Sequence, residues 1–178
     1  FIRADNCYYR RNSSRNEKTK TPQTVKVLQS PATDSCGEPY LVTGKNGLVY
    51  LSWIEKKGNT YQLRFSTFGN NGWTEPVSIA EGVNWFVNWA DYPVISADGA
   101  SSLLAHFLEK SDTAKFTYDI KLVSSSDTGK SWSNSKILHD DGIKAEHGFV
   151  SIIPYNDQFF VTCLDGRKTA SQQSHGGH

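Results

Sequence analysis

Several residues and patterns that assign a protein to a class are missing from this 178-residue sequence. It contains no methionine and only three cysteines, an odd set without the Cys-x-x-Cys spacing of structural zinc sites. No structural zinc site is therefore expected. A bridge between Cys7 and Cys36 remains open if the protein is exported. Cys163, inside FFVTCLDG, is expected to be a small buried apolar residue.

Long apolar runs and an excess of charge are also missing. The longest apolar stretches, such as FFVTCL, fall far short of the roughly 20 residues that a transmembrane helix requires. A formal net charge of +1 gives no general attraction to nucleic acid or to an anionic membrane. No stretch repeats apolar residues at i, i+3, i+4 and i+7, so almost no helix is predicted.

The residues that are abundant are typical of β-structure. Aromatic residues make up 12% of the chain, and glycine, serine, threonine and asparagine are frequent, which suits strands joined by turns. From residue 24 onward apolar and polar residues alternate, in TVKVLQS, PYLVTG, LVYLSWIEK, YQLRFSTF and PVSIAEG. We predict that the last four of these stretches form a meander of short strands.

Residues 1–23 differ from the rest of the chain. They are polar and basic with little periodicity, and they are predicted to form a flexible linker or arm. A basic contact site is the alternative, because the segment carries a run of positive charges, Arg10, Arg11, Arg15, Lys18 and Lys20.

The strand pattern recurs along the chain. PYLVTGKNGLVYLSWIEK, PVISADGASSLLAHFLEK and VSIIPYNDQFFVTCLDGR each combine two apolar strands, a polar turn and an acidic residue followed by a basic one. The acidic residues, Glu55, Glu109 and Asp165, are 54 and 56 positions apart. A repeat of roughly 55 residues with four antiparallel strands is typical of a β-propeller blade. A jelly roll or an immunoglobulin-type sandwich would not repeat the same unit in register.

The stretch SSSDTGKSW lies between the third and fourth strands of the second repeat. Ser125, Asp127, Gly129 and Trp132 give it the order S-x-D-x-G-x-x-W. It resembles the Asp-box, the turn between the third and fourth strands of blades in sialidases and other propellers with BNR repeats. The earlier stretch FSTFGNNGW resembles a degenerate copy, which keeps the serine and the tryptophan but lacks the aspartate.

The side chains of this motif indicate a structural role. Asp127 can accept backbone N–H bonds within the turn, Gly129 can take a positive φ, and Trp132 can bury its ring beneath the turn. One acidic side chain does not make an EF-hand loop, so calcium is not expected here. In the family that it resembles, this turn lies on the outer rim, away from the catalytic centre.

The resemblance implies the fold. Residues 24–178 are expected to form an all-β, sialidase-like partial β-propeller of four-stranded antiparallel blades. At roughly 55 residues a blade, they supply about two and a half of six blades. An open fragment would expose strand edges and apolar faces, so we expect a longer protein, in which the rest of the same propeller packs against this part. An extracellular, periplasmic or cell-surface location is expected.

Propellers bind ligands with the loops at one end of the central channel. Three long loops between repeats, SPATDSCGE, EGVNWFVNWAD and HDDGIKAEHG, and the ends of the second strands carry aromatic, acidic and basic groups. Trp85 and Trp89 are candidates for stacking on sugar rings, or else for packing between blades. The other candidates are polar side chains that can bind sugar hydroxyl or carboxylate groups: Asp34, Glu38, Asp91, Asp140, Asp141, Glu146, His147, Asp165 and Arg167.

Arg167 supports a catalytic alternative. CLDGR resembles the EGR phrase of sialidases, whose arginine binds the sialic acid carboxylate, and a guanidinium can hold a carboxylate bidentately. Two family residues are missing, because Gly148 stands near the position of a further arginine and KTASQQSHGGH has no acid/base aspartate. The predicted function is an exported module that binds a carbohydrate or a protein. A sialidase or related glycoside hydrolase is the alternative.

No cofactor is expected, and no metal site is assigned from the sequence. His175 and His178 in the terminal SHGGH, together with His147, are the alternative metal ligands, because imidazole binds zinc, copper and nickel.

Overall fold

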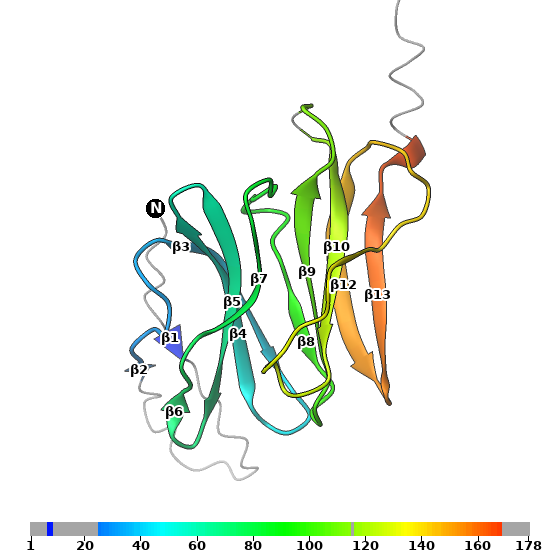
Figure 1. The fold of residues 1–178 in the computed structure, drawn as a ribbon. Coiled ribbons are helices and arrows are strands. Elements are labelled where there is room, and N and C mark those ends of the chain that lie inside the picture. The colour runs from blue at the N-terminus through cyan, green and yellow to red at the C-terminus, as the bar shows by residue number, and fades with distance from the viewer. Residues whose placement is uncertain (1–6, 9–24, 115, 169–178) are drawn as a thin grey trace, which may run out of the picture.

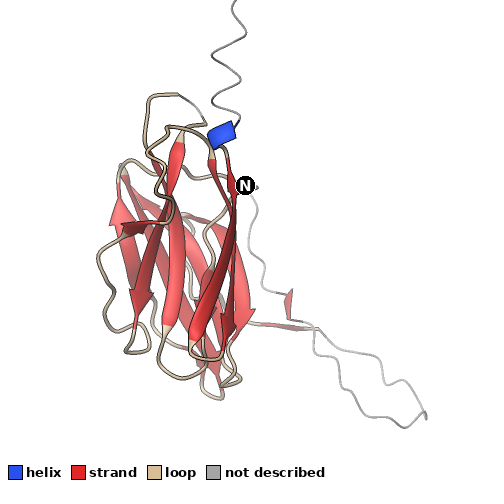
Figure 2. Cartoon of the chain, turned by 90° about the vertical axis from the view of Figure 1, so that its right-hand side faces the viewer, coloured by secondary structure: helices blue, strands red, loops and turns tan. Residues whose placement is uncertain are grey.

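The structure is a computed structural model that describes residues 7–8, 25–114 and 116–168. This part of the chain is all-β, which confirms the predicted class, and the described residues after the last strand end with two helical residues, 167–168 (Figure 2). Within these residues no helix has the length and apolar character needed to cross a membrane. The strands are β1 (Cys7–Tyr8), β2 (Lys26–Val27), β3 (Cys36–Thr43), β4 (Val49–Lys57), β5 (Thr60–Gly69), β6 (Gly72–Trp73), β7 (Val77–Gly82), β8 (Ile95–Ala97), β9 (Leu103–Lys110), β10 (Tyr118–Ser125), β11 (Lys136–Ile137), β12 (His147–Tyr155) and β13 (Gln158–Asp165).

Each repeat folds into its own antiparallel sheet. The first forms sheet I, in the order β3-β4-β5-β6, with β7 also paired to β5. The second forms sheet II, in the order β8-β9-β10-β11, and the third forms sheet III, the hairpin β12-β13. Strands β1 and β2 make a separate pair. The two predicted four-strand meanders are therefore confirmed, because successive strands of each repeat lie next to one another.

Sheet II lies between sheets I and III and is covered on both faces (Figure 1). Along β9, Leu103 and Phe107 pack in the hydrophobic cluster shared with sheet I, whereas Leu108 packs in the cluster shared with sheet III. Successive side chains of a strand point to opposite faces, so a strand buried on both sides needs apolar residues at odd and even positions alike. The sequence LLAHFL meets that requirement.

The three sheets repeat one arrangement. Their first strands, β3, β8 and β12, lie next to one another, and no sheet within the described residues closes on itself. Glu55 at the end of β4 pairs with Arg64 at 2.7 Å, and Glu109 at the end of β9 pairs with Lys121 at 3.0 Å. These two ion pairs occupy equivalent positions in the registers of sheets I and II. The first two repeats of the sequence therefore also share an ion pair at the same position.

The cysteines do not form the bridge that the sequence left open. Cys36 and Cys163 are both free thiols. Cys163 is half-buried against the cluster between sheets II and III, rather than fully buried as predicted. Burial raises the pKa of both thiols, so neither is activated as a thiolate.

The turn that follows β10 is held together by its own side chains. The Ser125 hydroxyl donates to Asp127 Oδ1 at 2.7 Å and accepts from the Gly129 amide at 2.9 Å. Asp127 Oδ1 also accepts from the Ser131 amide at 3.0 Å, and Oδ2 accepts from the Ser131 hydroxyl. These bonds hold the pKa of Asp127 well below its usual range. Asp127 therefore binds within its turn, as its neighbours in the sequence predict.

The same turn packs onto the neighbouring sheet. Gly129 has a φ of 86°, and a Cβ at this position would lie 2.3 Å from Phe65 Cζ of sheet I. The Trp132 ring meets the Phe65 ring edge to face, with centroids 5.9 Å apart. The turn thus joins sheet II to sheet I, and glycine is needed for both backbone conformation and space.

Gly129→Ala is expected to destabilise the fold more than Gly47→Ala. Both glycines have a positive φ, but a Cβ at Gly47 would have no atom within 4 Å. Gly47→Ala should lower the free energy of unfolding by about 1–2 kcal/mol, the cost of a left-handed alanine. Gly129→Ala should lose a further ~1–3 kcal/mol through overpacking against Phe65. Urea denaturation of both variants measures the difference, and equal losses would contradict the packing role.

Candidate functional site

The loops between repeats gather at one end of the sheets. In sheet I, Cys36 at the start of the first strand pairs with Glu55 at the end of the second, and in sheet III His147 pairs with Asp165 in the same way. Trp85 in the loop before sheet II forms an isolated bridge to Glu109. We call this end the loop rim: residues 28–35, 83–94 and 138–146 with the ends of β4, β9 and β13.

The two tryptophans of the middle loop have different environments. Trp85 is 4% exposed, and its ring stacks on Phe107 with centroids 4.3 Å apart. It belongs to the cluster between sheets I and II, which agrees with the packing alternative and leaves the ring almost no surface for a ligand. Trp89 is 82% exposed and remains available to a ligand.

Asp91 and Glu146 share one buried hydroxyl. The Tyr118 hydroxyl lies 3.1 Å from Asp91 Oδ2 and 2.9 Å from Glu146 Oε1. It has one proton, so both contacts are hydrogen bonds only if one carboxyl group is itself protonated. Burial raises the pKa of Asp91, and burial together with the bond to Glu146 raises that of Tyr118. Asp91 and Glu146 therefore hold the rim together, and Asp91 is too buried to serve as a free ligand-binding group.

Gly148 leaves the space that Asp91 occupies. A Cβ at this glycine would lie 1.9 Å from Asp91 Oδ2. The next residue, Phe149, has a φ of 52°, and its amide donates to Asp91 Oδ1 at 2.8 Å. An arginine side chain cannot stand at position 148 while Asp91 lies here. The glycine is therefore part of the packing of the rim.

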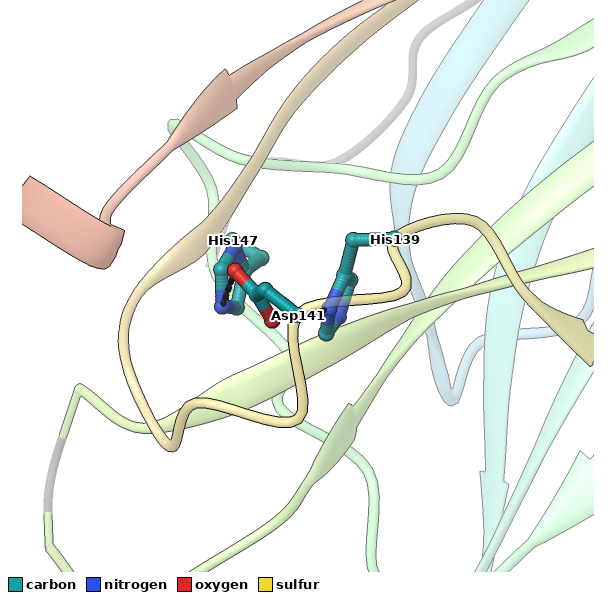
Figure 3. A group of neighbouring side chains, drawn as sticks. All are labelled: His139, Asp141 and His147. Atoms are coloured by element: carbon teal, nitrogen blue, oxygen red, sulfur yellow. Dashed lines mark hydrogen bonds and ion pairs between the residues drawn. The ribbon is translucent and has the colours of Figure 1, made fainter.

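Two imidazoles and a carboxylate meet in the last loop (Figure 3). His139, Asp141 and His147 point toward one another, and one ligand atom from each lies within 4.8 Å of the others. The imidazole rings are stacked, with centroids 3.9 Å apart. The side chains of Asp141 and His147 are only 4% and 1% exposed. All three residues come from one short segment, which closes on itself as it enters β12.

Arg167 lies beside this cluster and is already paired. Its Nε is 3.1 Å from Asp141 Oδ2, and its terminal nitrogen forms a short ion pair with Asp165. The bond from Arg167 lowers the pKa of Asp165 to about 2, while the Ile143 amide is the largest cause of the lowered pKa of Asp141. Both carboxylates are thus ionised. They neutralise the guanidinium of Arg167, which the sequence analysis gave as a candidate for binding a sugar carboxylate.

His139 is the residue that sequence reasoning missed. His147 was paired with His175 and His178, but these two lie outside the described residues. The partner that the structure gives His147 is His139, eight positions earlier, with Asp141 between them. The pattern H-x-D-x5-H was visible in the sequence, although only the closed loop shows that its side chains converge. Among the described residues, these three could hold a metal ion.

An open depression of about 580 Å³ lies beside the cluster. His139 lines it and also belongs to the cluster, so the two features share one wall. Side chains of both signs, Lys110, Asp119, Asp140 and Lys144, contribute to the lining.

The remaining candidates lie on the first loop and strand, where Asp34 is exposed and Glu38 is half-buried with a pKa raised by burial.

Comparison of this chain with protein-family models, with curated proteins and with solved structures finds no match.

Replacing Asp91 should separate its hydrogen bonds from its charge. Asp91→Ala leaves the Phe149 amide without its acceptor, and we expect a loss of about 1–3 kcal/mol in the free energy of unfolding. Asp91→Asn keeps an acceptor oxygen and should lose less. Urea denaturation at neutral pH compares the two variants, and equal losses would mean that the Phe149 bond contributes little.

The same pair of proteins, wild type and Asp91→Asn, should differ in pH dependence. Burial raises the folded-state pKa of Asp91 above its ordinary value of 3.8, so its stabilising contribution is complete below that value. The contribution is lost as the pH rises through the folded-state pKa. Wild type should therefore lose stability relative to Asp91→Asn as the pH is raised from below 3.8 to neutrality. A difference that stays constant across this range would contradict the raised pKa.

Proposed function

We propose that the repeats are successive blades of a sialidase-like β-propeller, of which this chain supplies about two and a half of six. The stacking of sheets I, II and III supports this proposal, because their first strands lie next to one another as the inner strands of blades do. The turn of Ser125, Asp127, Gly129 and Trp132 supports it as well. It bonds within itself and packs onto the preceding sheet.

The outer face of sheet III supports a further blade. Ile54, Leu108 and Leu164 each precede the acidic residue that ends the second strand of their repeat. Ile54 is buried between sheets I and II and Leu108 between sheets II and III, but Leu164 is 52% exposed. A position covered in two repeats is therefore uncovered in the third. The other exposed apolar residues on this face are Ile153, Tyr155 and Phe160.

Lysine substitutions on this face should reduce its binding to other apolar surfaces without unfolding the protein. The double variant Ile153→Lys/Phe160→Lys replaces two exposed residues that face each other across the hairpin. We expect weaker binding of a hydrophobic dye and less self-association in sedimentation, with a change in unfolding free energy within about 0.5 kcal/mol. Val83→Lys, at an exposed apolar position in a loop, is the control. Unchanged dye binding in the double variant would count against a docking face.

We infer that the loop rim binds a carbohydrate and does not hydrolyse it. The observation that carries this inference is the pairing of Arg167 with Asp141 and Asp165, which already engages the guanidinium that would bind the carboxylate of an acidic sugar. Trp89 supports binding, because an exposed indole offers a flat apolar surface to a sugar ring. A protein partner at the same rim is the alternative ligand. Export to the cell exterior belongs to this proposal and rests on the resemblance to sialidases.

A glycan array followed by titration of the best ligand tests the proposal. Trp89→Ala should weaken binding at least about tenfold, ~1.4 kcal/mol, because truncating an anchoring tryptophan removes most of its contact. Tyr155→Ala, an exposed aromatic at the far end of β12, should leave binding unchanged. No binding of any glycan would refute the carbohydrate ligand. Hydrolysis of a fluorogenic sialoside that is lost in Arg167→Ala would instead support the sialidase alternative.

A further inference from the structure

We propose that His139, Asp141 and His147 form a zinc-binding site. The proposal does not depend on the propeller or on a carbohydrate ligand, because it rests on the contacts of one loop. Two imidazole nitrogens and a carboxylate oxygen are a common ligand set for zinc in proteins. The contacts of the two rings indicate how they would hold a cation.

The hydrogen bonds of His139 define which of its nitrogens is free. Its Nδ1 lies 3.1 Å from Asp141 Oδ1, and since a carboxylate only accepts, Nδ1 carries the proton. In the neutral ring, Nε2 then has a lone pair. This atom is buried without a hydrogen-bond partner, and a carboxylate oxygen of Asp119 lies 3.5 Å away. A lone pair that faces a carboxylate is unfavourable, and the opposite tautomer would remove this conflict if a metal ion took the lone pair of Nδ1.

The same conflict occurs at His147. Its Nε2 donates to the Ile143 carbonyl at 3.1 Å, because a carbonyl oxygen can only accept. In the neutral ring Nδ1 then presents its lone pair to Asp165 Oδ1, 3.6 Å away. Asp141 Oδ2, close to both rings, is also buried without a hydrogen bond, although Arg167 Nε forms an ion pair with it at 3.1 Å.

The local charge favours a bound divalent cation. The three carboxylates of Asp119, Asp141 and Asp165 and the guanidinium of Arg167 give two net negative charges around the two rings. One divalent ion would cancel this charge.

The spacing of the ligand atoms is compatible with this assignment. Two atoms bound to one tetrahedral zinc ion lie about 3.3 Å apart, since each is about 2.0–2.1 Å from the metal. His139 Nδ1 and Asp141 Oδ1 are 3.1 Å apart, and Asp141 Oδ2 and His147 Nε2 are 3.9 Å apart. Zinc bound to these two nitrogens would replace their protons and shift each ring to its other tautomer, in which His139 Nε2 donates to Asp119 and His147 Nδ1 donates to Asp165. No pair in the cluster exceeds 4.8 Å.

Zinc titration of the chelator-treated full chain, against a competing colorimetric chelator, tests the site. Wild type should bind one Zn²⁺, and His139→Gln should weaken that binding at least about tenfold, because glutamine replaces the imidazole but can still donate to Asp141. Asp141→Asn provides a second loss variant. The double variant His175→Ala/His178→Ala is the matched control, since it removes two histidines outside the cluster and should keep the Zn²⁺.

Two readouts keep the result unambiguous. Circular dichroism establishes that each variant is folded, and Co²⁺ used in place of Zn²⁺ should give a visible absorption band in wild type that His139→Gln lacks. The proposal is overturned if folded wild type binds no Zn²⁺ or Co²⁺. It is also overturned if His139→Gln and Asp141→Asn bind as wild type does, or if binding disappears with His175 and His178 instead. None of these outcomes depends on glycan binding.

Discussion

Burial of sheet II on both faces is the constraint on which the other features depend. Its strands carry apolar side chains at successive positions, so a single covering layer would leave one apolar face in water. Sheets I and III supply the two layers, and the first strands of all three sheets are brought together as a result. This stacking carries the loops that join the sheets to one end, which explains why distant acidic, imidazole and aromatic groups meet there.

The groups that meet at the loop rim mostly satisfy one another. Asp91 binds the Phe149 amide and approaches Tyr118, which also contacts Glu146. Arg167 is held between two carboxylates. Such paired groups stiffen the rim and leave few charges free to take part in chemistry. Two side chains of the rim remain open to a ligand, the exposed Trp89 and the imidazole of His139, whose Nε2 has no hydrogen-bond partner.

The histidine cluster shows how a loop can build a site from residues that are close in sequence. His139, Asp141 and His147 need no distant strand to meet, because the segment that carries them turns back on itself before β12. Their surroundings do come from distant parts of the chain, since Asp119 lies on β10 and Asp165 ends β13. The negative charge around the two rings is therefore a property of the stacked sheets and not of the loop alone.

The strands, their order within each repeat and the all-β class were predictable from the sequence, because period-two alternation and turn residues act over a few neighbouring positions. The bonds of Asp127 within its own turn were predictable for the same reason.

Trp85 and Trp89 could not be told apart in this way. They occupy one loop, and only the position of Phe107 on a neighbouring strand decides that the first is buried. The pairing of Arg167 with Asp141, and the space that Gly148 leaves for Asp91, likewise depend on distances between loops. Those distances are set by how the sheets stack, and stacking is decided by the whole core and not by any local pattern.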